Sequence, residues 1–361
     1  MGIHDATHDT RALMLDDVAT YERADVHRVR DVLAKFPAQC RAAVELRPAL
    51  APATPRPRLI VVAGMGGSAA SGDLLAGCAA ERLDVPVLVH RGYGLPMLAG
   101  DRDLVIASSY SGDTAESLSA AEAALSRGCS LVAVTSGGRL AALARERGVP
   151  RVTLPAGLMP RMALGYLFFP LIGILKSADV HVVKGGEIEE TFGVIDALAA
   201  ELGPARPTAT NEAKRLAQAI GDHLPVVYGG PLTGTTAYRW KTDFEENSKT
   251  FAAAGVLPEM NHNEIEAWSG PLARELYLVL LRDREEGPEI TRRFGLLREL
   301  IAPGAAGVAE ASTRGGSYLA RLLSLAYLGQ WTSYYLAILR GVDPWSVPVL
   351  DALKGRMRSD G

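Results

Sequence analysis

Apolar residues follow two alternating spacings along most of this chain. Short runs rich in aliphatic and β-branched residues are separated by longer segments in which apolar residues recur every three or four positions. Such alternation of strands and amphipathic helices is typical of a parallel sheet covered on both faces. We expect the strands of a first sheet at Leu59–Ala63, Val85–His90, Leu104–Ser108, Leu131–Thr135 and Arg151–Leu154.

A second unit of the same kind follows a largely helical stretch over residues 163–220. Its first strand-to-turn junction, VVYGGPLTGTTAY, weakly resembles VVAGMGGSAASGD in the first unit, which indicates two related α/β halves. We expect a strand at Pro225–Tyr228, a turn at Gly229–Thr236, a helix at Ala237–Lys249, strands near Leu276–Leu281 and Ala305–Glu310, and a long helix at Tyr318–Leu339.

Four segments are therefore predicted. Residues 1–57 form a helical arm and linker, because Tyr21–Leu50 has helical spacing interrupted by Pro37 and ends in a Pro/Ala-rich run. Residues 58–178 form the first subdomain. Residues 179–342 form the bridging helices and the second subdomain. Residues 343–361 form a tail that closes with a short helix carrying Lys354.

Composition excludes several classes of protein. The net charge of −3 without a long basic run disfavours a nucleic-acid partner or an anionic membrane surface. The longest apolar stretch, Leu164–Leu175, is about half the length that crosses a bilayer. No secretory signal is readable at the N-terminus. Three scattered cysteines, Cys40, Cys78 and Cys129, make a disulfide framework improbable and point to a reducing cytoplasm.

Two loops after predicted strands have the chemistry of an anion site. Gly64–Ser68 ends one strand and opens a helix, where glycines admit a ligand and free amides favour phosphate. Ser109–Thr114 ends another strand with hydroxyls at Ser109, Ser111 and Thr114, at the same edge of the sheet. We interpret Asp113 as a helix cap. The loops lack a Walker lysine and a full dinucleotide fingerprint, so they suit a monophosphate.

The Ser109–Thr114 loop resembles the phosphosugar-binding loop of SIS (sugar isomerase) domains, and GMGGSAASGDL resembles the first loop of the bifunctional phosphoglucose/phosphomannose isomerases. Further resemblances follow in order at PRMALGYLF, EENSKTF, PEMNHNEIEAW and Asp343-Pro344 with Leu353-Lys354, so that residues 55–358 are covered. The resemblance implies two flavodoxin-like SIS subdomains of α/β/α architecture. It also implies a homodimer that interconverts aldose and ketose phosphates without a metal or other cofactor.

The same resemblance implies roles for individual residues. The phosphate of the substrate would be held by Gly67, Ser68, Ser109, Ser111 and Thr114. Glu246 would be the catalytic base, and Arg161 would stabilise negative charge on the enediolate. His262, reaching the site of the neighbouring subunit, and Lys354 would open the sugar ring.

Two departures from the family pattern bear on the substrate. Trp345-Ser346-Val347-Pro348 stands where a threonine that leaves room for both C2 epimers is expected, so dual glucose/mannose specificity is open. Asp113 replaces an expected asparagine and adds a negative charge near the anion.

From the residues alone, each assignment has an alternative. Glu246 can also be interpreted as a surface carboxylate. Glu245 points about 100° away on the helix, so we expect it to be the more solvated of the two. Arg161 and Lys354 can also be interpreted as surface charges at helix ends. His262 can also be interpreted as a structural or exposed histidine. A zinc site is a poor alternative, since the one H-x-x-x-H pair, His4 and His8, lies in the polar N-terminal start.

Two other functions are compatible with a sugar-phosphate-binding fold. The main alternative is a catalytically silent SIS protein that binds a sugar phosphate and regulates a partner. A DNA-binding regulator would need a basic helix-turn-helix, and the arm mixes acidic and basic residues.

Overall fold

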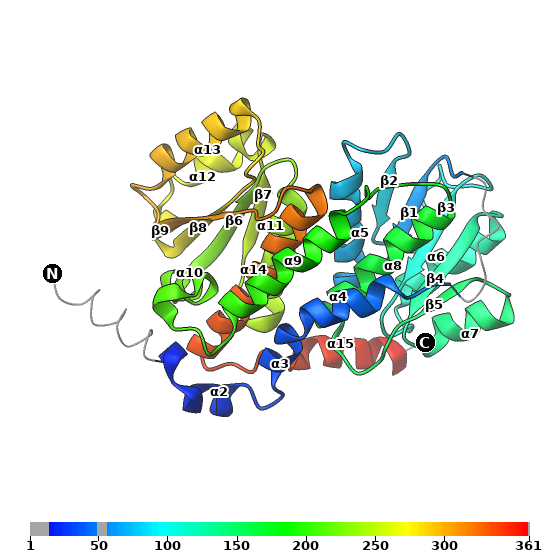
Figure 1. The fold of residues 1–361 in the computed structure, drawn as a ribbon, viewed down its shortest axis with the longest axis horizontal. Helices are drawn as coiled ribbons and strands as arrows, with labels where there is room; N and C mark the ends of the chain where they lie inside the picture. The colour runs from blue at the N-terminus through cyan, green and yellow to red at the C-terminus, as the bar shows by residue number, and fades with distance from the viewer. Residues whose placement is uncertain (1–13, 49–55, 360–361) are drawn as a thin grey trace.

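Two parallel β-sheets form the frame of the molecule (Figure 1). The computed structural model describes residues 14–48 and 56–359. The first sheet has the strand order β2-β1-β3-β4-β5, which is the flavodoxin-like order. Its strands are β1 Ile60–Ala63, β2 Val87–His90, β3 Leu104–Ser108, β4 Ser130–Thr135 and β5 Arg151–Thr153. The predicted strands are thereby confirmed to within two residues at each end.

The second sheet has the order β7-β6-β8-β9 and is also parallel throughout. This order repeats that of β2-β1-β3-β4, so the two halves share one topology, as the similar strand-to-turn junctions predict. Its strands are β6 Leu224–Gly229, β7 Ala253–Val256, β8 Leu276–Arg282 and β9 Gly307–Ser312. The edge strand β7 is absent from the prediction because Ala-Ala-Gly-Val carries one β-branched residue and no alternation.

Helices cover the faces of both sheets. On β1, Ile60 and Val62 enter one apolar core and Val61 and Ala63 enter another, as expected for a sheet buried on both sides. The longer helices are α5 Gly66–Ala79, α6 Ala115–Ser126, α7 Gly138–Glu146, α8 Leu164–Ser177, α9 Glu187–Leu202, α10 Glu212–Ile220, α11 Gly234–Asn247, α13 Pro288–Ile301, α14 Tyr318–Leu339 and α15 Pro348–Ser359. Short helices are α12 Glu264–Ala267 and the 3₁₀ turns η1 Pro160–Met162, η2 Thr208–Thr210, η3 Glu259–His262 and η4 Pro271–Glu275.

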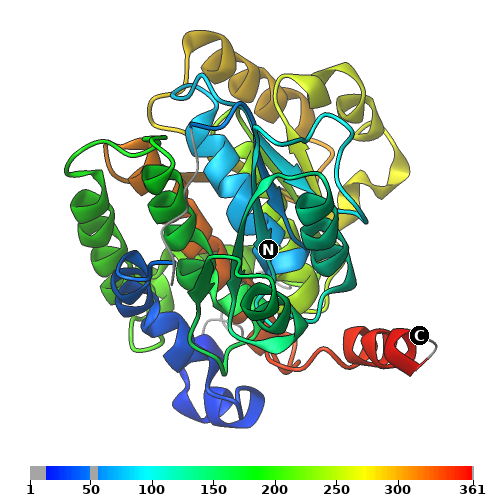
Figure 2. The same cartoon turned by 90° about the vertical axis from the view of Figure 1, so that its right-hand side faces the viewer.

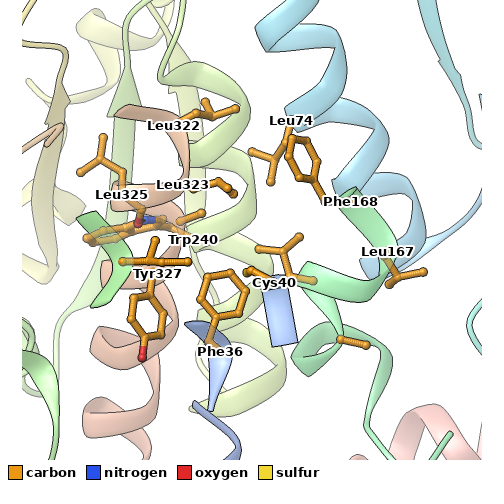
Figure 3. Packing of buried hydrophobic residues seen from close by; sticks show 14 of the residues in the cluster. Phe36, Cys40, Leu74, Leu167, Phe168, Trp240, Leu322, Leu323, Leu325 and Tyr327 are labelled. Carbon is orange, nitrogen blue, oxygen red and sulfur yellow. The ribbon is translucent and has the colours of Figure 1, made fainter. Parts of the chain in front are cut away.

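Helix α14 runs through the middle of the molecule and joins the two halves (Figure 1). It is buried from Leu319 to Ile338, which explains why apolar residues surround it on all sides. Figure 3 shows Leu322, Leu323, Leu325 and Tyr327 of α14 among side chains of α4, α5, α8 and α11. Among the described residues, no helix has the length and apolar character needed to cross a membrane.

The predicted N-terminal helical segment packs into this core. It forms α2 Val18–Ala24, α3 Val29–Ala34 and α4 Phe36–Val44. The last break falls just before Phe36, since Pro37 in the first turn of α4 fits a helix start. Phe36 and Cys40 are buried against α8 and α14 (Figure 3). All three cysteines are buried and unpaired.

Candidate active site

The loop between β1 and α5 contains glycines at two close backbone approaches. A Cβ atom on Gly64 would lie 2.9 Å from the carbonyl oxygen of Ser108, and one on Gly67 would lie 2.7 Å from that of Pro160. A side chain fits at neither position, so packing requires glycine at both. Gly67 thereby brings the start of α5, with its free amides, against the segment that carries Arg161.

The Ser109–Thr114 loop after β3 is tied both internally and to the first loop. The Ser109 hydroxyl donates to Thr114 Oγ1 at 2.9 Å and accepts from the amide of Gly112 at 3.1 Å. The amide of Tyr110 donates to Ser68 Oγ at 3.3 Å. Ser68 and Ser109 are buried, whereas Ser111 is exposed and Thr114 is half-buried. Ser111 and Thr114 therefore offer the accessible hydroxyls, and the two buried serines fix the shape of the loops.

Asp113 caps a different helix from the one that follows it. Its Oδ1 accepts the amide hydrogen of Arg139 at 3.0 Å, in the first turn of α7. The helix directly after the loop, α6, has Thr114 at its N-cap and no side-chain cap bond. Asp113 is therefore a helix cap, as predicted, but it caps α7 and not the helix that follows it in the sequence. It reaches α7 because the loops after β3 and β4 are packed together.

Arg161 is a buried residue, so its interpretation as a surface charge is wrong. Its side chain is 3% exposed and lies in the 3₁₀ turn η1. Nε donates to Asn247 Oδ1 at 2.7 Å, and Nη2 donates to the carbonyl oxygens of Pro344 and Trp345 at 2.8 and 2.7 Å. Burial lowers the pKa of the guanidinium, although Glu246 acts in the opposite direction.

Glu246, near the end of α11, faces Arg161. Its Oε2 lies 3.5 Å from Arg161 Nη1, and its side chain is 33% exposed. Glu245 turns away and pairs with Lys241 at 2.7 Å, one helical turn earlier, as its angular offset predicts. The expectation that Glu245 is the more solvated is wrong, because it is also 33% exposed.

A buried polar network packs around Arg161 and Glu246. Asn247 links Arg161 to Ser333 of α14 through a 2.9 Å hydrogen bond. Arg239 pairs with Asp243 on α11 at 2.8 Å, and both side chains are buried. Burial raises the pKa of Asp243 to about 6, against the effect of Arg239. These residues were not predicted from the sequence, although Asn247 lies within EENSKTF and Arg239 and Asp243 have i,i+4 spacing.

His262 and Lys354 lie apart from this cluster within one chain. His262 is exposed at the end of η3, and Lys354 is exposed on α15. Figure 2 shows α15 projecting from the body of the molecule. In the described ranges 14–48 and 56–359, no hydrogen bond or ion pair joins either residue to Arg161 or Glu246. Their catalytic roles stay predictions.

No metal site competes with this arrangement in the part of the chain that the structure describes. It contains no group of three or more His, Cys, Asp or Glu side chains able to hold an ion. His4 and His8 lie outside the described residues. Two cavities lie elsewhere: one of about 600 Å³ between α6 and α7, and one of about 120 Å³ beside the β6 and β8 loops. None of the predicted site residues lines either cavity.

Comparisons with known proteins agree with this arrangement of two units. Residues 56–150 match the SIS domain family, and residues 209–357 match the bacterial phospho-glucose isomerase C-terminal SIS domain. A bifunctional phosphoglucose/phosphomannose isomerase of Caldicellulosiruptor bescii is 39% identical over 82% of this chain and 89% of the relative. One of Aquifex aeolicus is 34% identical over 83% of this chain and 90% of the relative.

A solved structure supports the same fold. A glucose-6-phosphate isomerase like protein from Thermus thermophilus superposes with a TM-score of 0.62 and covers 94% of this chain and 98% of its own. At 23% sequence identity this likeness shows the fold alone.

Proposed function

The chain belongs to the bifunctional phosphoglucose/phosphomannose isomerase family, and on that basis we propose that it interconverts glucose 6-phosphate, mannose 6-phosphate or both with fructose 6-phosphate. It would be an intramolecular oxidoreductase that needs no metal. The observation that carries the proposal is the contact between Glu246 and the buried Arg161, which Gly67 and Pro160 connect to the start of α5. A base, a fixed cation and an anion-binding helix start thus lie in one region.

The isomerisation moves two protons within an open-chain sugar, one from C2 to C1 and one from O2 to O1, while the carbonyl group moves from C1 to C2. Glu246 takes the proton from C2 of the aldose, the C–H electron pair forms the C1–C2 double bond, and the O1 carbonyl becomes an oxyanion. Arg161 stabilises this cis-enediolate, and its buried position strengthens the interaction. The hydroxyl proton of O2 then passes to O1. The O2 electron pair forms the C2 carbonyl while the C1–C2 double-bond pair takes the proton from Glu246 at C1, which gives the ketose. Atoms and electrons balance without an external oxidant.

The two loops would hold the phosphate group at the other end of the substrate. The amides at the start of α5 and the hydroxyls of Ser111 and Thr114 supply the donors. Gly67, Ser68 and Ser109 position those donors by the packing and hydrogen bonds described above. Anchoring the phosphate fixes C1 and C2 relative to Glu246, which contributes through proximity and orientation.

Ring opening requires a proton donor and acceptor near O1 and the ring oxygen. We assign these steps to Lys354 and to His262 of the partner subunit of a homodimer. The exposed position of His262 at the end of η3 agrees with a role in a neighbouring site. Exposure of Lys354 on the projecting helix α15 requires that this helix move or pack in the assembly (Figure 2).

Selectivity between the C2 epimers would depend on the tail that follows Asp343. Trp345 is held by Arg161 and stacks on His27, with ring centroids 5.6 Å apart. Ser346, in the segment where the family has a threonine, donates its amide hydrogen to Asp343. If Ser346 takes the place of that threonine, its smaller side chain would leave at least as much room beside C2, and both epimers would be accepted.

The test is a coupled assay of fructose 6-phosphate formation from each aldose phosphate, in buffer with EDTA. Wild type should be active, and Glu246→Gln should lose roughly 10²–10⁴-fold in kcat, the typical contribution of a general base. Glu245→Gln, one residue away, is the matched control and should stay within about twofold. Unchanged activity of Glu246→Gln would remove Glu246 from the mechanism, and loss of wild-type activity in EDTA would point to a metal.

The alternative is a silent protein that binds a sugar phosphate and regulates a partner. The retention of Arg161 and Glu246 in contact argues for catalysis, since binding a phosphate needs neither of them. Wild type that binds fructose 6-phosphate in calorimetry without turning over either aldose phosphate would favour this alternative.

A further inference from the structure

One lysine connects the end of α11 to the start of the C-terminal tail. The Lys249 ammonium donates to the carbonyl oxygen of Asp343 at 2.6 Å, of Glu246 at 2.9 Å and of Asn247 at 3.3 Å. An ammonium has three N–H donors, so its hydrogen-bonding capacity is fully used on backbone carbonyls. Two of these carbonyls belong to the last turn of α11, next to the Glu246 side chain.

The backbone at Lys249 has a conformation that is unusual for a residue with a side chain. Its φ is +52°, the left-handed conformation in which a helix end usually has glycine. A lysine is less favourable than glycine there, because its Cβ crowds the following carbonyl oxygen. The left-handed turn lets the lysine side chain fold back onto the helix end it has just left.

The tail that Lys249 holds also fixes Arg161. The carbonyl oxygens of Pro344 and Trp345 accept both hydrogen bonds of Arg161 Nη2. Asp343 accepts the amide hydrogen of Trp345 at 2.9 Å, which closes the tail into a turn. His27 of the N-terminal segment adds a 3.4 Å contact to Asp343 and the stack on Trp345. Arg161 and Glu246 are thus held to one another through the tail as well as by their direct contact.

We propose that Lys249 is a positioning residue for the isomerisation: it ties the end of α11 to residues 343–345 and so fixes Glu246 relative to Arg161. This inference rests on the proposed function. Lys249 itself need not touch the substrate, because its donors already bind backbone carbonyls. Its loss would displace the base from the enediolate-stabilising cation, and small displacements of catalytic groups cost large factors in kcat.

The charges around Lys249 predict a pH dependence. The charged groups that face Lys249 directly are Arg161 of η1, Glu246 of α11 and Asp343 of the tail. His27 contacts Asp343 and so acts on Lys249 through it. Partial desolvation of the ammonium, on a residue that is exposed as a whole, and the nearby Arg161 guanidinium lower the pKa of Lys249 to about 8. Above pH 8 the neutral amine loses one of its three donors and its charge. We therefore expect kcat to fall above that pH, with KM nearly unchanged.

Three variants test the proposal by kcat, KM and their pH profiles between pH 6.5 and 10. Lys249→Met should lower kcat at pH 7 about tenfold or more, with KM within about threefold, and should lose the fall of kcat above pH 8. Lys249→Arg keeps a permanent charge and donors, so it should restore most of kcat and move the alkaline fall upward. Lys249→Gly suits the left-handed turn, so it should fold at least as stably as wild type and still lose kcat.

Lys241→Ala, on the same helix and in a half-buried pair with Glu245, is the control and should match wild type. The proposal is overturned if Lys249→Gly is folded and has wild-type kcat, or if Lys249→Arg and Lys249→Met share the wild-type alkaline profile. A wild-type protein inactive on both aldose phosphates would instead contradict the proposed function, which separates the two failures.

Discussion

Gly67 occupies the point where the start of α5 meets the segment carrying Arg161. Since the nearest atoms to an added Cβ are the carbonyl oxygen and carbon of Pro160, at 2.7 and 2.9 Å, the obstacle is backbone and cannot rotate away. We predict that Gly67→Ala displaces Pro160 and Arg161, lowers the free energy of unfolding by about 1–3 kcal/mol and lowers kcat by tenfold or more. Urea unfolding and the coupled assay measure both.

The matched control for that substitution is Gly193→Ala. Gly193 lies inside α9 and has no heavy atom within 4 Å of an added Cβ. Alanine there should stabilise the helix by about 0.5–1 kcal/mol and leave kcat unchanged. If Gly67→Ala behaves like this control, the close approach at Pro160 does not position the site.

At the level of single residues, the sequence was informative where a motif fixes both residue type and place. The contact of Glu246 with Arg161 joins EENSKTF to PRMALGYLF, two motifs about eighty residues apart. The contacts of Lys249 and Asn247 were not predictable, because they depend on which backbone carbonyls and side chains the fold brings to these two residues. Asp113 shows the same limit, since its helix comes from the next loop of the sheet.

At the level of elements, most strands and helices were predictable from spacing, since buried parallel strands are short aliphatic runs between amphipathic helices. The strand β7 and helix α13 were not anticipated. Ala253–Val256 has too little β-branched character, and it becomes a strand because β6 offers it an open edge. Tertiary pairing, not local preference, decides such a segment.

Helix α15 is the element whose contribution is best separated from folding. Val349, Leu353 and Met357 are 83%, 55% and 55% exposed, so the helix gains little from the body of its own chain. We predict that removal of residues 348–361 changes the free energy of unfolding by less than about 1 kcal/mol, since little apolar area is lost. It should lower kcat strongly, because Lys354 is removed.

Lys354→Met in the full chain should reproduce that loss in the coupled assay. If the truncation abolishes turnover and Lys354→Met does not, the helix contributes something other than this lysine. A large fall in stability on truncation would show that α15 packs against another surface in solution.

At the scale of the whole molecule, the fold explains what the first described segment does. Helices α2–α4 contribute Phe36 and Cys40 to the core between the halves, and His27 reaches the tail at Trp345. The site therefore combines the N-terminal segment, both α/β units and the tail. Sequence patterns predict each of these parts, but the way they meet follows from packing around α14.

The assembly supplies the last test, because the proposed role of His262 requires a second subunit. Glu246→Gln and His262→Ala homodimers should each be nearly inactive. If His262 acts across the interface, a mixed dimer has one site with two substitutions and one with an intact Glu246 and His262. Random exchange makes half of the dimers mixed, and half of their sites intact, so activity should recover to about a quarter of wild type. If His262 acts within its own chain, both sites of the mixed dimer are defective, and mixing recovers nothing.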